Sequence, residues 1–139
     1  MSLRPFHLAI AVDDLPAARA FYGEALGCPE GRSDERWIDF SLEGHQLVVH
    51  QVDGGAGDRG TQAVDGHGVP VPHFGLVLTM ARWSELADRL RTAGAAFVLE
   101  PQLRFVGQPG EQATFFLRDP AGNALEFKAF ADDAQLFAT

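Results

Sequence analysis

The sequence predicts an α+β protein built from two repeated β-α-β-β-β modules, and three observations lead to this prediction. A short apolar strand that opens on a histidine occurs twice, at 7–12 and at 73–78. A helical segment that ends before a glycine follows each of these strands, at 13–26 and at 80–93. Segments with the alternating polarity of β-strands then complete each half of the chain.

The two helical segments carry end signals. Asp13 or Asp14 can cap the N-terminus of the first helix, and Pro16 suits its first turn. Gly27 and Gly94 suit the positions that follow the two C-termini. Apolar residues recur on one face of each helix, where we expect core packing: Leu15, Ala18, Tyr22 and Leu26 in the first, and Trp83, Leu86, Leu90 and Ala93 in the second.

Strands are expected after each helix. In the first half, residues 37–42 alternate in polarity, Glu43-Gly44 predicts a turn, and residues 46–52 form the next strand. A shorter strand near Cys28 is expected before them. The three strands expected after the second helix are 96–100, 113–118 and 124–130. Pro101 is expected to end the first of these three.

The chain is expected to form a single domain. The first module spans about residues 5–52, a connection spans 53–72, and the second module spans about 73–131. The connection is rich in glycine and is broken by Pro70 and Pro72. A connection of this length without regular structure is uncommon inside a compact domain, so a flap over a site and a flexible linker are both open interpretations.

Charge and composition exclude several classes of partner. The chain has 139 residues with 19 acidic against 11 basic side chains, a net charge of −8. This balance repels phosphate backbones and anionic lipids, so neither nucleic acid nor a membrane is expected as a partner. The sequence shows no apolar run of membrane-spanning length and no signal-peptide pattern, and its one cysteine cannot form a disulfide framework. We therefore expect a cytoplasmic protein.

Strand alternation predicts which side chains face away from the helices. If Leu8 and Ile10 pack against a helix, then the histidine that opens their strand projects from the opposite face. The same argument applies to the other strands, and the polar side chains expected on that face are His7, His50, His73, Glu126 and Lys128. Small residues beside them, Ala9, Ala11 and Gly75, are expected to leave room for a ligand.

His7, His73 and Glu126 together form a candidate metal site. Two histidines and one carboxylate are the ligand set of a facial triad with open positions, which suits Fe(II) and other divalent ions. Each histidine alone could be a strand residue with a simple hydrogen bond. The repeated strand-opening histidine, with a glutamate of matching alternation, favours the metal site.

Two motifs make the chain resemble the vicinal oxygen chelate superfamily. They are Phe21-Tyr22-Gly23-Glu24-Ala25-Leu26-Gly27 and Asp119-Pro120-Ala121-Gly122-Asn123-Ala124-Leu125-Glu126-Phe127. This superfamily includes glyoxalase I, methylmalonyl-CoA epimerase, extradiol dioxygenases and the fosfomycin- and bleomycin-resistance proteins. The resemblance covers about residues 5–131 and implies two βαβββ modules whose strands curl into a metal-binding cup, with the helices outside.

The resemblance also implies ligands and partners. The superfamily's ligands correspond to His7, His73 and Glu126, and one divalent ion is implied without its identity: Fe, Mn, Ni, Co or Zn. A fourth ligand is usual on the fourth strand. Aligning Gly44 with Gly122 places Val48 there, so His50 remains an alternative ligand or an acid/base group. A homodimer is also implied.

The implied function is a divalent-metal-dependent enzyme that acts on a small substrate through two adjacent oxygens. A lyase, an isomerase and an Fe(II) dioxygenase all fit, with Glu126 or His50 moving a proton. The alternative is a non-catalytic drug- or metabolite-binding resistance protein of the same fold. Further substrate-binding candidates, which could instead be solvated loop or rim residues, are Arg104, Gln108, Glu111 and Lys128.

Overall fold

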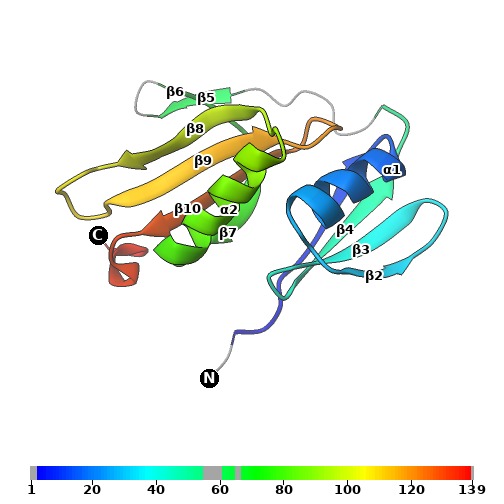
Figure 1. Cartoon of the computed structure of the whole chain (residues 1–139), viewed down its shortest axis with the longest axis horizontal. Coiled ribbons are helices and arrows are strands. Elements are labelled where there is room, and N and C mark those ends of the chain that lie inside the picture. Colours follow the sequence, from blue (N-terminus) through cyan, green and yellow to red (C-terminus); the bar gives the residue numbers. More distant parts are fainter. Residues whose placement is uncertain (1–2, 55–60, 65–66, 139) are drawn as a thin grey trace. The chain divides into compact units, whose positions relative to one another are not determined.

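The computed structural model describes residues 3–54, 61–64 and 67–138 of the chain. The chain divides into two compact units, each with a four-stranded mixed sheet (Figure 1). Unit 1 comprises Met1–Asp58 and Asp119–Asn123, and unit 2 comprises Arg59–Arg118 and Ala124–Thr139. These sheets and their helices confirm the predicted α+β fold of two modules. No helix among the described residues is both long enough and apolar enough to cross a membrane.

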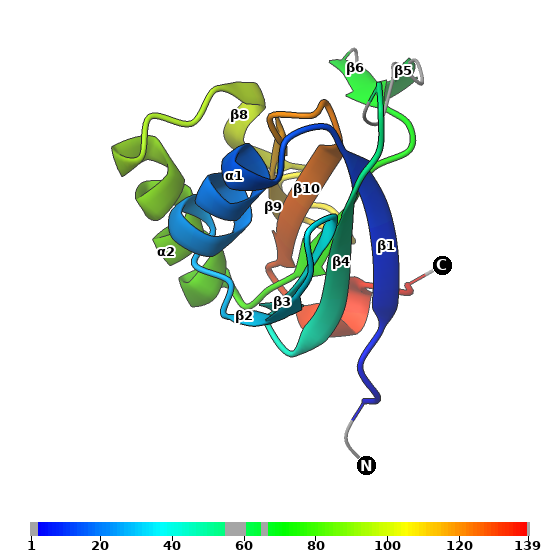
Figure 2. The same ribbon diagram turned by 90° about the vertical axis from the view of Figure 1, so that its right-hand side faces the viewer.

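The sheet of unit 1 has the strand order β1-β4-β3-β2. β1 runs parallel to β4, and the other neighbouring pairs are antiparallel. The helical segment lies on one side of this sheet (Figure 2). The elements are β1 (His7–Val12), α1 (Leu15–Ala18), a π-helical turn (Arg19–Ala25), β2 (Glu30–Ser33), β3 (Trp37–Leu42) and β4 (His45–Gln51).

The first helix begins as predicted and then widens. The Asp14 carboxylate accepts a hydrogen bond from the Ala17 amide at 3.1 Å, which caps the N-terminus. The Leu26 amide then donates to the Phe21 carbonyl five residues back, at 2.9 Å, as in a π-helix. Gly27 follows with a φ of +74°, which glycine adopts without strain. Apolar spacing does not separate π- from α-helical turns, so the sequence did not indicate this widening.

The sheet of unit 2 has the strand order β7-β10-β9-β8, with β7 parallel to β10. Helix α2 covers one face of it, and the Trp83 indole N–H donates to the Phe127 carbonyl at 3.0 Å. Thr79 caps this helix by accepting from the Arg82 amide. The elements are β7 (Phe74–Val77), α2 (Met80–Thr92), β8 (Phe97–Arg104), β9 (Gln112–Arg118), β10 (Ala124–Phe130) and a 3₁₀ turn (Asp133–Gln135).

Two strand predictions are corrected by the structure. β8 does not end at Pro101 but continues to Arg104. A proline is tolerated because β8 is the edge strand, and its register with β9 shifts between Leu99 and Gln102. The connection 53–72 has regular structure, since β5 (Thr61–Val64) pairs antiparallel with β6 (His67–Pro70). The short strand expected near Cys28 is present as β2.

The turn Asp119–Asn123 connects two strands of unit 2 but belongs to unit 1. The buried Tyr22 hydroxyl donates to Asp119 Oδ2 at 2.7 Å, and Asn123 Nδ2 donates to the Ala11 carbonyl at 2.8 Å. The Asp119 carboxylate also accepts from the amides of Ala121 and Asn123. These contacts explain the Asp-Pro-x-Gly-Asn part of the motif as a structural turn within unit 1.

Candidate functional site

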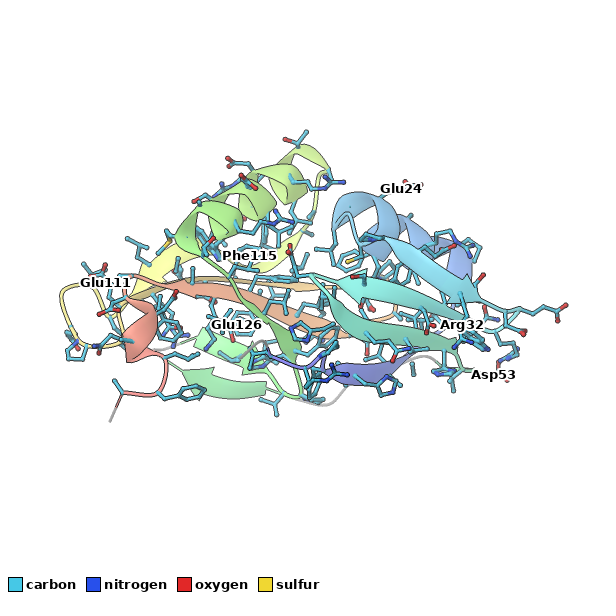
Figure 3. All side chains as sticks on the ribbon, turned by 90° about the horizontal axis from the view of Figure 1, so that it is seen from below. Glu24, Arg32, Asp53, Glu111, Phe115 and Glu126 are labelled. Atoms are coloured by element: carbon cyan, nitrogen blue, oxygen red, sulfur yellow. The ribbon has the colours of Figure 1, made fainter. Side chains whose placement is uncertain are left out.

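The face of the unit 2 sheet opposite α2 carries polar side chains. Along β10, Leu125 and Phe127 are fully buried against the helix side, and Glu126 and Lys128 alternate with them, as predicted. Figure 3 shows Glu126 on the other side of the sheet from Phe115, which lies toward the helix. The pairing register places Glu126 beside Gly75 of β7 and Lys128 beside Thr114 of β9.

His73 and Glu126 face each other across this surface. Nε2 of His73 lies 3.2 Å from Oε1 of Glu126. The other ring nitrogen, Nδ1, lies 2.7 Å from the Pro70 carbonyl oxygen. Because a carbonyl only accepts, Nδ1 carries the proton of that hydrogen bond, and Nε2 presents its lone pair in the neutral ring. Two lone pairs this close require a proton or a metal cation between them.

The electrostatics favour an ionised Glu126. Burial acts to raise the pKa of this carboxyl, but the hydrogen bonds from His73 and Thr114 and the charge of Lys128 outweigh it and lower the pKa below its ordinary value. The hydrogen bond to Glu126 raises the pKa of His73 against the opposing effect of burial. The contact between Nε2 and Oε1 thus lowers the pKa of Glu126 and raises that of His73, as expected for a hydrogen-bonded acid–base pair.

Gly75 lets β7 and β10 approach each other closely. A Cβ atom at this position would lie 1.5 Å from the Glu126 carbonyl oxygen and 2.6 Å from its carbon. The sequence predicts that a small residue here leaves room for a ligand, but the structure fills that space with the backbone of β10. The glycine is required for β7 and β10 to pair at the rung of Glu126.

The donor atoms of this pair fit a divalent metal ion. An imidazole nitrogen and a carboxylate oxygen suit Fe, Mn, Co, Ni and Zn, and the Pro70 carbonyl orients the ring as outer-sphere partners of metal-bound histidines do. Within the part of the chain that the structure describes, no group of three or more His, Cys, Asp or Glu side chains lies together in a way that could hold a metal. Unit 2 therefore brings together two of the three predicted ligands.

His7, the third predicted ligand, lies in unit 1 at the start of β1. Its Nδ1 lies 2.9 Å from Oε1 of Gln46, the residue beside it on β4. An amide oxygen only accepts, so Nδ1 donates this hydrogen bond, as Nδ1 of His73 does to Pro70. In both His7 and His73, Nδ1 is thus the ring nitrogen that donates to a nearby oxygen.

Val48 occupies the position on β4 that corresponds to Glu126 on β10. In unit 1, Ala9 of β1 pairs with Val48 of β4, just as Gly75 pairs with Glu126 in unit 2. His50 is exposed and lies beside Ala11, two residues further along β4 on the same face. This register agrees with the predicted displacement of His50 from the position that corresponds to Glu126.

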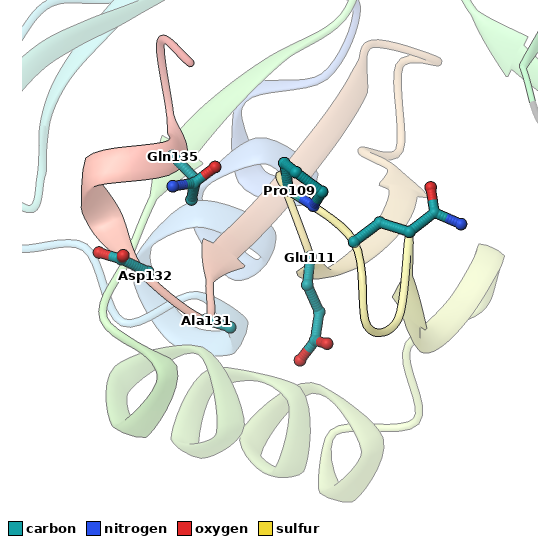
Figure 4. A pocket seen from close by; sticks show the side chains of 6 residues that line it. Pro109, Glu111, Ala131, Asp132 and Gln135 are labelled. Atoms are coloured by element: carbon teal, nitrogen blue, oxygen red, sulfur yellow. The ribbon is translucent and has the colours of Figure 1, made fainter. Parts of the chain in front are cut away.

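The predicted substrate-binding residues lie at different places in unit 2. Lys128 is beside the pair, with Nζ 4.0 Å from Glu126 Oε1 and 5.8 Å from the centre of the Phe130 ring. Arg104 ends β8, where its guanidinium lies 5.1 Å from the centre of the Phe105 ring. A cavity of about 310 Å³ is lined by Gln108, Pro109, Glu111, Ala131, Asp132 and Gln135 (Figure 4). Gln108 and Glu111 thus line a cavity with the C-terminal segment, and Glu126 does not line it.

The sequence reasoning missed Thr114. This residue is fully buried, and its hydroxyl donates to Oε2 of Glu126 at 2.6 Å. A threonine on β9 with the same alternation as Glu126 was the available signal, but its contact with the carboxylate depends on the register between β9 and β10.

The family model of the Glyoxalase/Bleomycin resistance protein/Dioxygenase superfamily matches residues 4–127. A solved structure of a glyoxalase/bleomycin resistance protein/dioxygenase from Alicyclobacillus acidocaldarius is 34% identical, with a TM-score of 0.78 over 96% of both chains. The chain belongs to this superfamily, as its motifs predict. Members of the superfamily typically use a divalent metal ion and bind small molecules.

Two more distant structures share the fold. The fosfomycin resistance protein FosX from Listeria monocytogenes is 17% identical, with a TM-score of 0.68 over 98% of both chains. The lactoylglutathione lyase from Agrobacterium tumefaciens is 19% identical, with a TM-score of 0.67 over 99% of this chain and 98% of its own. A comparison with curated proteins gave no match.

Proposed function

We propose that this protein is a divalent-metal-dependent enzyme that acts on a small substrate through two adjacent oxygen atoms. The observation that carries the proposal is the 3.2 Å approach of His73 Nε2 to Glu126 Oε1. The outer atoms of both groups are already occupied, Nδ1 by the Pro70 carbonyl and Oε2 by the Thr114 hydroxyl. A cation between the two inner atoms satisfies both lone pairs at once.

The proposed ligands are His73, Glu126 and His7. The third ligand comes either from the same chain or from the second copy in a homodimer, which the superfamily resemblance favours. His50 is an alternative fourth ligand or acid/base group, and its exposed side chain on the face of His7 is compatible with either role. A bound divalent ion would act as a Lewis acid that stabilises negative charge on the two substrate oxygens.

The chain's own residues supply the remaining chemistry. Lys128 places a positive charge on the face of Glu126, where it can orient an anionic group of the substrate. The Glu126 carboxylate, or alternatively the His50 imidazole, moves a proton in a lyase or isomerase reaction. In an Fe(II) dioxygenase reaction the ligand set is His7, His73 and Glu126. Arg104, Gln108 and Glu111 are proposed to bind polar parts of the substrate away from the reacting atoms.

Metal analysis of the purified protein tests the proposal. We expect about one divalent ion for each set of the ligands His7, His73 and Glu126. The ion should be present in the protein as purified or after reconstitution with Fe(II), Mn(II), Ni(II), Co(II) or Zn(II). His73→Ala should lower this content, whereas His45→Ala should not, because Nδ1 of His45 accepts from the Phe6 amide. Oxygen uptake with a catechol in the iron-loaded protein would select the dioxygenase reaction.

The same experiment tests the competing class. A protein that takes up no stoichiometric divalent ion under any of these conditions would refute the metal-dependent enzyme. The function would then be better explained as that of a non-catalytic resistance protein that binds a drug or metabolite. Equal metal loss in the His73 and His45 variants would instead refute the ligand assignment.

A further inference from the structure

The Glu126 carboxylate is held on one side by a buried hydroxyl. Thr114 has no exposed surface, and its Oγ1 donates to Oε2 of Glu126 over only 2.6 Å. Distances this short are typical of a hydroxyl that donates to an ionised carboxylate. Glu126 itself is 7% exposed, so little water is available to replace this donor.

We propose that Thr114 is a positioning residue that makes Glu126 a one-oxygen metal ligand. The inference rests on the proposed metal site. With Oε2 bound to Thr114, the oxygen that faces Nε2 of His73 is Oε1. A carboxylate that binds through one oxygen occupies one coordination position rather than two. This leaves more positions on the ion for two substrate oxygens.

The sheet register explains why Thr114 reaches this carboxylate. Glu126 is directly opposite Phe116, and Thr114 is directly opposite Lys128, so Thr114 and Glu126 are diagonal neighbours on one face. Threonine is β-branched and stiff about χ1, so its hydroxyl keeps one direction once its methyl group is packed.

Lys128 is the competing partner for Glu126. Its Nζ lies 4.0 Å from Oε1, beyond hydrogen-bond distance. Without the Thr114 hydroxyl, the carboxylate loses the contact that holds Oε2 and can turn toward this ammonium group. We therefore expect loss of the hydroxyl to weaken metal binding even though Thr114 touches no metal.

The test compares three single variants with the wild-type protein. Thr114→Val removes the hydroxyl and keeps the shape, and Thr114→Ser keeps the hydroxyl. Thr79→Val is the matched control, because Thr79 also loses one hydrogen bond, to the Arg82 amide at the start of α2. Affinities for Co(II) and Zn(II) are measured by competition with a chromophoric chelator. The visible spectrum of bound Co(II) reports the ligand geometry.

We expect Thr114→Val to bind Co(II) and Zn(II) about 10–100-fold more weakly, the usual loss for an outer-sphere partner, with a changed Co(II) spectrum. Thr114→Ser should keep most of the affinity, because it keeps the hydroxyl and loses only the methyl group that fixes its direction, and Thr79→Val should stay at the wild-type value. If Thr114→Val does not fold, Thr114→Ala against Thr114→Ser makes the same comparison.

Three results would overturn the inference. Wild-type affinity in Thr114→Val refutes the role of Thr114 and leaves the metal site standing. Equal losses in the Val and Ser variants assign the effect to packing rather than to the hydroxyl. Absence of stoichiometric metal in the wild-type protein itself overturns the proposed function and this inference together.

Discussion

Removing the Tyr22 hydroxyl tests how the Asp119–Asn123 turn is held in unit 1. Tyr22 is completely buried and donates to Asp119 Oδ2 over 2.7 Å. Tyr22→Phe keeps the ring and its edge contact with Phe21, whose centroid lies 4.8 Å away, so the change is confined to the hydroxyl. The measured loss of stability is therefore the contribution of one charge-assisted hydrogen bond.

The expected magnitude follows from what remains around Asp119. Its Oδ2 keeps the donor Asn123 Nδ2 at 2.8 Å, and its Oδ1 keeps the amides of Ala121 and Asn123. No carboxylate oxygen is left without a donor, so the loss is that of one hydrogen bond to a charged group, about 1.5–3 kcal/mol. For a chain of this size that corresponds to a fall in Tm of about 5–12 °C.

Urea unfolding followed by circular dichroism and tryptophan fluorescence measures this loss. The double variant Tyr22→Phe/Asp119→Asn completes a cycle whose coupling energy isolates the pair. Trp37 lies in unit 1 and Trp83 in unit 2, so variants that keep only one of them report each unit separately. A stability loss below about 0.5 kcal/mol, the usual size of a neutral surface change, would contradict a charge-assisted hydrogen bond between Tyr22 and Asp119.

Three further predictions concern the Tyr22 hydroxyl at alkaline pH, the close approach of Gly75 to β10 and the Trp83 side chain of α2. Burial, together with the charge and hydrogen bond of Asp119, raises the pKa of Tyr22. The neutral Tyr22 side chain therefore makes its full contribution to the free energy of unfolding below its unfolded pKa of about 10, and this contribution is lost as pH rises through its folded pKa. Tyrosinate absorbance should therefore appear only with unfolding, because Tyr22 is the single tyrosine; titration of the native protein near pH 10 contradicts this. Gly75→Ala should prevent normal pairing of β7 with β10 and cost several kcal/mol in urea unfolding, whereas Gly23→Ala, whose Cβ meets Phe40 at an ordinary 3.6 Å, should change stability by about 1 kcal/mol or less. Equal losses in the two alanine variants would disprove the close approach. Trp83→Phe should lose about 1–3 kcal/mol because the buried Phe127 carbonyl loses its indole donor, and an unchanged urea midpoint would count against that hydrogen bond.

The fold class and the helix limits could be predicted because they depend on local patterns. Apolar residues every three or four positions predict α2, and the structure places that helix at Met80–Thr92. Alternation along 124–130 places Glu126 and Lys128 on the face opposite Leu125 and Phe127, as observed.

Other features were not predictable from local pattern. The continuation of β8 through Pro101 depends on an edge position and a shifted register, both set by β9. The pairing of β5 with β6 in the glycine-rich connection also lacks the alternating pattern on which the strand predictions rest. In each case the deciding contact is with another segment of the chain.

The two-module family and the residue types of the candidate site could both be inferred from the amino-acid sequence. His73 and Glu126 could be proposed as partners from alternation alone, because side-chain direction in a strand repeats every two residues. The hydrogen bond from Thr114 to one oxygen of Glu126, and the backbone of β10 in the space beside Gly75, are visible only in the folded structure. Both contacts join strands through their register, and register is set by how whole strands pair rather than by the residues next to each position.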